Sequence, residues 1–307
     1  MKAYVRVDPV SQEVACTQVP MPDIGPEEVL VKVEAFGVGI HDRYFIPGQV
    51  PFPYTIGSEG AGTLTKIGTQ VTGFKPGDRV IFTTILQPQG GSWAEYASTH
   101  HSNLIPLPGT LTFAQGAAVP IAGKTALECM RSINLGAGDR LFIAGASGAI
   151  GTLVIQMASA RGIKVAASAS EKNQAYMQSL GAEKTVDYRD PDWPQQVRDW
   201  SQGGVEVALA IQPGTGTASM EVVRDGGQLI TVSGDSDQVV PERAIAVSQM
   251  GHHADTQQKV VELVDALARG EIKIVVEKEY SFEQALEALE KTETRHARGK
   301  LVVRGLQ

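Results

Sequence analysis

The sequence predicts an α/β fold in which a doubly wound parallel sheet is joined to a mostly β, barrel-like domain. Two sequence patterns, in successive regions of the 307-residue chain, support this prediction. From Met1 to about Leu111, short β-type runs are punctuated by Pro and Gly, which is typical of antiparallel barrels. From about Thr112, apolar strand-like runs alternate with helical segments, which indicates a parallel sheet. We therefore assign residues 1–113 to the β domain, 114–255 to a dinucleotide-binding domain and 256–307 to a return into the β domain.

The first region opens with an alternating, strand-like run at residues 1–8, and further β-type runs occur at 29–35 and 79–82. Residues 53–68 collect several glycines around Glu59, so the backbone is expected to approach another group closely there.

Residues 141–151 predict a buried strand that turns through glycines directly into a helix, with residues 152–161 helical and Gly162 ending the helix. Each glycine has a physical role: Gly145 for a tight turn, Gly148 for close approach of backbone N–H groups to a pyrophosphate, and Gly151 for contact between helix and strand. A strand at 163–168 closes the βαβ unit. Because any tight strand-to-helix turn can carry glycines, this context is what favours a dinucleotide site.

The rest of the second region continues the alternation. Helices are predicted at 114–120 and 123–131, strands at 185–188, 205–211 and 228–232, and an amphipathic helix at 256–268. The tail adds a strand near 272–276, a helix at 282–291 and a strand at 300–303, and we expect it to rejoin the first domain.

The residues after the second strand of the βαβ unit bear on cofactor choice. An NAD site would place an acidic residue there to hold the ribose 2′-hydroxyl, but the chain has Ser168 to Asn173, with small hydroxyls and Lys172. These suit a 2′-phosphate, so NADPH is favoured over NADH. Glu171 keeps NADH open, and Ser170 could instead serve only as a helix N-cap.

Composition narrows the partners. The chain is 42% hydrophobic and 20% charged with a net charge of −7, which is ordinary for a globular enzyme and argues against nucleic acid or an anionic membrane as the partner. The two cysteines, Cys16 and Cys129, give neither a disulfide framework nor a zinc-binding spacing. No run has the length of a membrane span or the form of a signal peptide, so we expect a cytoplasmic protein with a small-molecule substrate.

Several short blocks occur in a fixed order along the chain: 57–62 (GSEGAG), 74–80 (FKPGDRV), 91–96 (GSWAEY), 122–126 (AGKTA), 145–151, 180–182 with 186–188, and 299–303 (GKLVV). Together they resemble the medium-chain dehydrogenase/reductase superfamily over nearly the whole chain. Within it, the chain is similar to the zinc-independent quinone oxidoreductase and enoyl reductase branch. The resemblance implies that the β domain is GroES-like and catalytic, and that the protein is a homodimer paired through strand edges near residues 244–249.

Zinc enzymes of that superfamily hold a catalytic metal that polarises the substrate oxygen. The matching positions here are Gly39, Ser58 and about Ile121, which cannot form a zinc site. The histidines elsewhere, including the pairs His100–His101 and His252–His253, are interpreted as ordinary surface residues. We therefore expect no metal.

Reduction of a conjugated carbonyl needs less charge stabilisation by the protein than alcohol oxidation does. Negative charge delocalises onto the carbonyl oxygen, and a hydrogen-bond donor or water can quench it. Tyr44 is the first candidate donor, since it matches a position at which related quinone reductases carry a tyrosine near the nicotinamide. Tyr54 is second and His41 third. An aromatic side chain that only lines the substrate site is the alternative role for Tyr44.

The cofactor candidates follow from the strand ends and the resemblance. Gly145, Ser147, Gly148, Ala149, Ile150 and Gly151 should line the pyrophosphate turn, and Ser170, Lys172 and Tyr188 should meet the adenosine end. The resemblance places Thr125 on the nicotinamide side and Tyr188 against the adenosine. Ile211, Ser233 and Gly234 end parallel strands, where such crevices bind ligands.

These inferences predict an NADPH-dependent, zinc-independent oxidoreductase that reduces quinones or α,β-unsaturated carbonyls such as 2-alkenals and 2-alkenones. One alternative is a 2-enoyl thioester reductase. Another is a non-catalytic NADPH-binding protein that acts as a sensor or interaction partner. The sequence names neither the particular substrate nor the proton donor.

Overall fold

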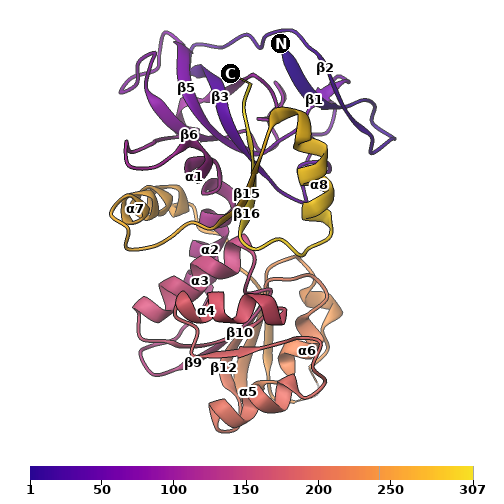
Figure 1. Cartoon of the computed structure of the whole chain (residues 1–307), viewed down its shortest axis with the longest axis vertical. Coiled ribbons are helices and arrows are strands. Elements are labelled where there is room, and N and C mark those ends of the chain that lie inside the picture. Colours follow the sequence, from indigo (N-terminus) through magenta and orange to yellow (C-terminus); the bar gives the residue numbers. More distant parts are fainter. Residues whose placement is uncertain (242, 307) are drawn as a thin grey trace. The chain divides into compact units, whose positions relative to one another are not determined.

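The structure is a computed structural model that describes residues 1–241 and 243–306. It divides into two compact units: unit 1 comprises Met1–Ile121 and Val264–Gln307, and unit 2 comprises Ala122–Leu263 (Figure 1). The boundaries predicted at 113/114 and 255/256 therefore lie at 121/122 and 263/264. The reason for the first shift is helix α1 (Phe113–Ala117), which packs on strands of unit 1: a Cβ built on its Gly116 would lie 3.1 Å from Ala61 and 3.2 Å from Ile81.

Unit 2 contains a six-stranded parallel sheet in the order β11-β10-β9-β12-β13-β14. The strands are β9 (Arg140–Ala144), β10 (Lys164–Ser168), β11 (Lys184–Val186), β12 (Val205–Ala210), β13 (Val223–Thr231) and β14 (Ala246–Gln249). The chain moves outward from β9 on one side and then starts again at β12 on the other, which is the doubly wound order. The predicted fold class is confirmed.

The helices of unit 2 alternate with these strands. They are α2 (Pro120–Ser132, which begins in unit 1), α3 (Ala149–Ala160), α4 (Gln174–Ser179), α5 (Trp193–Ser201), α6 (Gly216–Met220) and α7 (Thr256–Ala268, which ends in unit 1). Leu141, Phe142 and Ile143 of β9 are fully buried, as a central parallel strand covered on both faces requires. The Phe142 ring stacks on Trp193 of α5 at 5.1 Å between ring centroids, which anchors that helix to the sheet.

Unit 1 contains a seven-stranded and a three-stranded sheet. The first has the order β15-β16-β3-β5-β6-β8, with β7 also paired to β3, and the second has the order β2-β1-β4. The strands are β1 (Lys2–Arg6), β2 (Val14–Gln18), β3 (Glu28–Val38), β4 (Tyr54–Thr55), β5 (Glu59–Ile67), β6 (Arg79–Thr83), β7 (Tyr96–His100), β8 (Leu104–Pro106), β15 (Val276–Tyr280) and β16 (Lys300–Arg304). Among the strand pairs that the structure describes in unit 1, only β15–β16 is parallel, so the prediction of a mostly antiparallel domain is confirmed.

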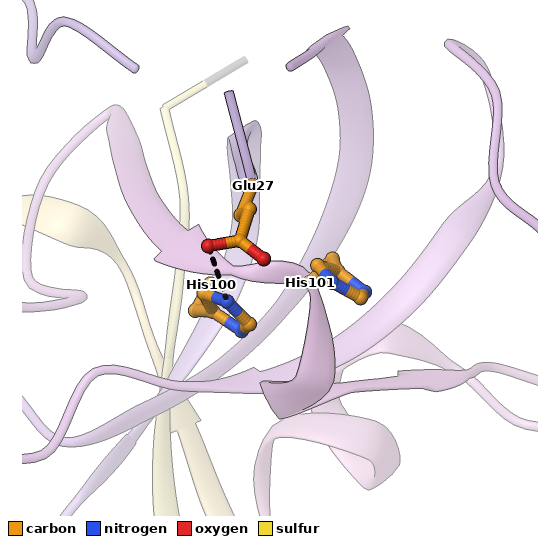
Figure 2. Close-up of side chains that lie close together, drawn as sticks. All are labelled: Glu27, His100 and His101. Atoms are coloured by element: carbon orange, nitrogen blue, oxygen red, sulfur yellow. Dashed lines mark ion pairs between the residues drawn. The ribbon is translucent and has the colours of Figure 1, made fainter. Parts of the chain in front are cut away.

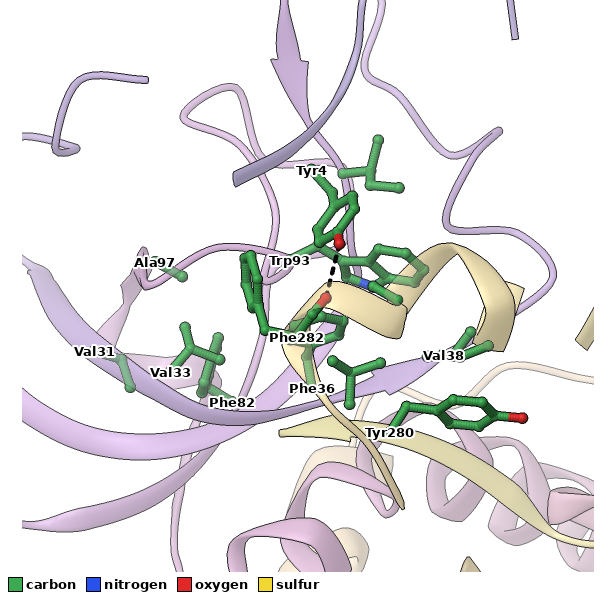
Figure 3. Close-up of a cluster of buried hydrophobic side chains, with 14 of the residues drawn as sticks. Tyr4, Val31, Val33, Phe36, Val38, Phe82, Trp93, Ala97, Tyr280 and Phe282 are labelled. Carbon is green, nitrogen blue, oxygen red and sulfur yellow. Dashed lines mark hydrogen bonds between the residues drawn. The ribbon is translucent and has the colours of Figure 1, made fainter. Parts of the chain in front are cut away.

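An aromatic cluster forms the centre of unit 1 (Figure 3). Trp93, which is fully buried, stacks on Phe36 of β3 at 5.0 Å and meets Tyr4 of β1 edge-on at 6.0 Å. Phe282 from the tail packs against both Tyr4 and Phe36, and its carbonyl accepts a 2.8 Å hydrogen bond from the Tyr4 hydroxyl. The tail therefore completes the core of unit 1, as predicted.

The tail differs from the prediction in one element. The strand predicted at 272–276 is β15 at Val276–Tyr280, and helix α8 spans Ala285–Glu293. β15 lies at the edge of its sheet, and its Glu277, Lys278 and Glu279 are polar, so hydrophobic patterning does not reveal it.

Candidate functional site

The turn after β9 holds Gly145 in a conformation that favours glycine and brings Gly151 close to the backbone of the turn. Gly145 has φ +78°, which favours glycine, and a Cβ there would lie 3.1 Å from the backbone nitrogen of Gln212. A Cβ on Gly151 would lie 2.6 Å from the Cα and O atoms of Ala146, so only glycine allows the helix to sit this close to the turn. Gly148 has φ −75°, and a Cβ there would meet only the Gly145 carbonyl, at 3.5 Å. An Ala side chain would therefore fit at 148, so the fold of the turn itself does not require glycine there.

Helix α3 begins at Ala149, three residues before the predicted Thr152, because the turn is shorter than expected. Gly148 is the N-cap and offers no side chain to the first-turn amides of Ala149 and Ile150. Those amides have no partner within the helix, and they lie at the positive end of the helix dipole. The residues present therefore fit a pyrophosphate.

The ends of neighbouring strands converge on this turn. The amide of Ala146 donates to the Ser168 carbonyl at the end of β10, and the Ile211 amide donates to the Ala144 carbonyl at the end of β9. The Ser233 hydroxyl, after β13, donates to the Ile211 carbonyl at 3.0 Å, and Gly234 follows with φ +79°. The structure therefore brings together the predicted residues that follow β9, β12 and β13. The remaining predicted residue of this group, Thr125, lies half-buried on α2.

The ends of β10 and β11 carry the predicted adenosine-side residues. The Glu171 amide donates to the Asp187 carboxylate at 3.1 Å, which joins the segment holding Ser170 and Lys172 to the segment holding Tyr188. Lys172 is exposed, and Tyr188 is 47% exposed.

Arg189 is a further basic residue at this edge that sequence reasoning missed. Its guanidinium contacts the Asp187 carboxylate with Nε at 2.9 Å and Nη2 at 2.5 Å, and this pairing holds the pKa of Asp187 well below its usual range. The available signal was a basic residue directly after the predicted Tyr188.

Unit 1 contains a buried polar cluster at one end of β3. The Asp42 carboxylate accepts a hydrogen bond from the Gly39 amide and another from the Ser58 hydroxyl, both at 2.7 Å. Glu59 accepts the amide of Ile121 at 2.7 Å and forms an ion pair with Lys300 of β16. Asp42, Ser58, Glu59 and Lys300 are all buried.

The charges of this cluster do not balance, because it holds two carboxylates and one ammonium group. Burial raises the pKa of Asp42 to about 6, although Lys300, the Gly39 amide and the Ser58 hydroxyl oppose the shift. The Asp42 carboxylate therefore takes up a proton at a higher pH than an ordinary aspartate. Of this cluster, Ser58, Glu59 and Lys300 were not predicted as a set. Their only sequence signals were an acidic residue among glycines and the closing Gly-Lys pair.

The predicted proton donors differ in surroundings. His41 directly precedes Asp42; burial, followed by the positive charges of Arg295 and Lys300, lowers its pKa, and its ring stacks on Phe45 at 4.7 Å. Tyr44 lies in the same loop with 47% of its surface exposed. Tyr54 is buried, its hydroxyl donates to the Gln87 carbonyl at 2.5 Å, and burial raises its pKa to about 12. His41 and Tyr44 therefore lie together, whereas the Tyr54 hydroxyl has a backbone partner.

The three positions matched to zinc ligands lie around this cluster. Gly39 and Ile121 contribute backbone amides to Asp42 and Glu59, and Ser58 contributes a hydroxyl to Asp42. One hydroxyl and two amides do not make the Cys and His donor set of a zinc site.

Within the residues that the structure describes, no helix is long and apolar enough to cross a membrane.

Comparisons with known proteins agree with this architecture. Residues 25–109 match the alcohol dehydrogenase GroES-like domain, and residues 180–303 match a family described as zinc-binding dehydrogenase. Quinone oxidoreductase of Rattus norvegicus is 31% identical over 293 residues, covering 89% of this chain and 87% of that protein. The 2-methylene-furan-3-one reductase of Solanum lycopersicum is 29% identical over 319 residues, covering 99% of this chain and 79% of that protein. A solved structure described as an NAD-dependent alcohol dehydrogenase superposes with a TM-score of 0.89 at 25% identity, covering 99% of both chains.

Proposed function

Because this chain belongs to the medium-chain dehydrogenase/reductase superfamily, in its quinone oxidoreductase-like branch, we propose that it is an NADPH-dependent reductase of quinones or of 2-alkenals and 2-alkenones. That it is an oxidoreductase using a nicotinamide cofactor follows from the family; the choice of NADPH and of substrate is the proposal. The observation that carries it is the glycine turn before α3, where strand ends converge at the reversal of strand order.

Unit 2 would hold the cofactor, which supplies hydride to an electron-poor double bond when bound. The amides of Ala149 and Ile150 would bind the pyrophosphate, with Ser147 and Gly148 lining the same turn. The first-turn amides also stabilise negative charge there through the helix dipole.

The preference for NADPH rests on the edge formed by β10 and β11. Lys172 and Arg189 are cationic and exposed, and the Glu171 amide ties their two segments together through Asp187. Two cations and the Ser170 hydroxyl suit a 2′-phosphate. Arg189 is paired with Asp187, so it would serve the phosphate as part of an ion-pair network. Glu171 and the NAD-dependent structural relative keep NADH as the alternative.

The substrate class is supported by the names of relatives and by the residues of unit 1. The rat relative is a quinone oxidoreductase, and the tomato relative reduces a conjugated enone. Neither reaction needs a metal, because the negative charge that develops on oxygen is delocalised. Tyr44, with an exposed side chain, is the first candidate proton donor. His41 is a further candidate, but burial lowers its pKa, which makes it better suited to donating a hydrogen bond to the developing negative charge. Asp42 is a positioning residue, since it fixes the loop that carries both through Gly39 and Ser58.

We also propose a cytoplasmic location and a homodimer. β14 is an edge strand of the sheet in unit 2, and pairing of two copies through it would cover the exposed edge. Light scattering at micromolar concentration that gives only monomer would remove the dimer.

Calorimetric titration with NADPH and NADH, for wild type, Lys172→Ala and Arg189→Ala, tests the cofactor site. At least tenfold tighter binding of NADPH, reduced in both variants, is expected; tenfold corresponds to about 1.4 kcal/mol. Equal binding of NADH would remove the 2′-phosphate argument and make Glu171 the ribose ligand. If neither cofactor binds, the glycine turn is only architectural.

Turnover with a panel of quinones, 2-alkenals, 2-alkenones and a 2-enoyl thioester tests the reaction. Chelator treatment is expected to leave the rate unchanged. Tyr44→Phe should lower kcat more than Tyr54→Phe, because the Tyr54 hydroxyl is already bonded to Gln87. A preference for the thioester would favour an enoyl thioester reductase. Tight NADPH binding without turnover of any compound would favour a non-catalytic NADPH sensor.

A further inference from the structure

Three side chains of kinds that can bind a metal ion lie together in unit 1, at the start of β3 and the end of β7 (Figure 2). One ligand atom from each of Glu27, His100 and His101 can be chosen so that all three lie within 4.8 Å of one another. His100 Nε2 is 3.9 Å from Glu27 Oε2. The sequence predicted that the two histidines are ordinary surface residues, since paired histidines at loop-like positions usually are. The strand pairing that brings Glu27 beside them is not visible in the sequence.

The backbone that carries these side chains is fixed by strand pairing. Glu28 of β3 pairs with His100 of β7, and the ladder continues by one bond, from the His101 amide to the Glu27 carbonyl at 3.0 Å. β3 is also paired with β5 and β16. A ligand set on such a frame has little backbone entropy to lose when it closes around an ion.

A neighbouring hydroxyl can orient His100 for metal binding. Ser102 Oγ lies 2.8 Å from His100 Nδ1. When Nδ1 carries the proton and donates to that hydroxyl, Nε2 has a free lone pair on the side of Glu27. In the other tautomer, Nδ1 accepts the Ser102 amide at 3.2 Å, and Nε2 carries the proton. A metal at Nε2 would select the first tautomer, as partners behind ligating histidines commonly do.

We propose that Glu27, His100 and His101 bind Zn²⁺ in an open site that keeps a fourth position for water. Two imidazoles and one carboxylate form a donor set that zinc accepts, whereas Mg²⁺ and Ca²⁺ prefer oxygen ligands alone. The side chains must close in, since ligands about 2.0–2.1 Å from a tetrahedral ion lie roughly 3.3 Å apart. The side chains of His100 and Glu27 are 42% and 59% exposed, so they can turn toward one ion without repacking the core.

The site lies at the opposite end of β3 from Gly39 and Asp42, so we assign it no part in hydride transfer. Its expected role is structural: a bound ion would link the ends of β3 and β7 and stabilise their pairing. This proposal does not depend on the proposed function.

Calorimetric titration of the tag-free, chelator-treated full chain with ZnCl₂ at pH 7.5 tests the site. We expect one Zn²⁺ per chain at micromolar Kd, no heat of binding with MgCl₂, and a higher Tm with zinc. His100→Ala and Glu27→Gln should each weaken binding at least tenfold, and Ser102→Ala by less, because it removes only the orienting hydroxyl. His252→Ala, which removes an exposed histidine of unit 2, is the matched control and should bind as wild type.

The proposal fails if the wild type binds no Zn²⁺ up to 100-fold excess, or if His100→Ala/His101→Ala keeps wild-type affinity. It fails equally if His252→Ala loses the zinc. Circular dichroism on each variant identifies any loss of fold, and Glu27→Gln, which keeps size and backbone, decides the outcome where a histidine variant is misfolded.

Discussion

Gly151→Ala and Gly148→Ala are expected to separate the architectural role of the glycine turn from its binding role. A methyl group at 151 would lie 2.6 Å from the Cα and O atoms of Ala146, which are backbone and cannot rotate away. Overpacking of this kind costs about 1–3 kcal/mol, and the better helix propensity of Ala returns up to about 1 kcal/mol. We expect a net loss of about 1–2 kcal/mol in the free energy of unfolding, which leaves a folded protein.

The same methyl group at 148 makes no close contact, since the nearest atom is the Gly145 carbonyl oxygen at 3.5 Å. Loss of a glycine N-cap costs about 0.5–1 kcal/mol, and the reduced freedom of the unfolded chain returns about 0.4–1 kcal/mol because φ −75° suits Ala. Stability should therefore stay within about 0.5 kcal/mol of wild type. NADPH affinity should fall at least tenfold, because the methyl group occupies the space through which a pyrophosphate would reach the helix amides.

Urea unfolding followed by circular dichroism, and calorimetric titration with NADPH, measure the two effects on the same samples. Gly151→Ala with wild-type stability would show that helix and turn are not in close contact. Gly148→Ala with wild-type NADPH affinity would show that the pyrophosphate does not bind at this turn. That result would leave open cofactor binding at another place in unit 2.

Three further predictions concern buried groups. In unit 2, burial raises the pKa of Glu128, but hydrogen bonds from Thr256 and His253 outweigh burial and lower that pKa to about 2. The ionised Glu128 carboxylate therefore stabilises the folded state fully above about pH 4.5, and this stabilisation is lost as the pH falls toward 2. Glu128→Gln should lower the free energy of unfolding by about 1–3 kcal/mol at pH 7. In urea unfolding, this difference from wild type should become smaller below pH 4.5. The folded pKa of Asp42 is raised to about 6 from 3.8, so wild type should gain up to about 3 kcal/mol between pH 7 and pH 4 relative to Asp42→Asn; a constant difference between the two would contradict this. Tyr4→Phe removes the bond to the Phe282 carbonyl and should lower stability by about 1 kcal/mol, whereas Tyr44→Phe should not change it.

The parallel sheet could be predicted because its evidence is local. β9 is apolar and is followed at once by its glycines, so strand, turn and helix are all specified within residues 140–162. β15 could not be found from hydrophobicity, because three successive residues of this edge strand, Glu277 to Glu279, are charged. The boundary near residue 113 was misplaced for a related reason: α1 has a helical pattern, and only its packing assigns it to unit 1.

The buried polar cluster shows why site residues are harder to predict than folds. Its members come from the loop after β3, the start of β5, the start of α2 and the start of β16, so no window of sequence contains them. Asp42 was visible as a residue but not as a group with a raised pKa, because that shift depends on burial and on the distant Lys300. The residues proposed for the cofactor were easier to place in the fold, since they follow the ends of parallel strands that the sequence itself predicts.

Unit 1 depends on the C-terminal tail for both kinds of interaction that hold its centre together. Phe282 supplies apolar surface to Tyr4 and Phe36, and Lys300 supplies the only ammonium group of the described buried cluster with Asp42 and Glu59. Without the tail, those two carboxylates would be buried with no compensating charge, which costs several kcal/mol per ion. Residues 1–121 therefore lack a balanced core of their own. The chain must pass through all of unit 2 before unit 1 can be completed.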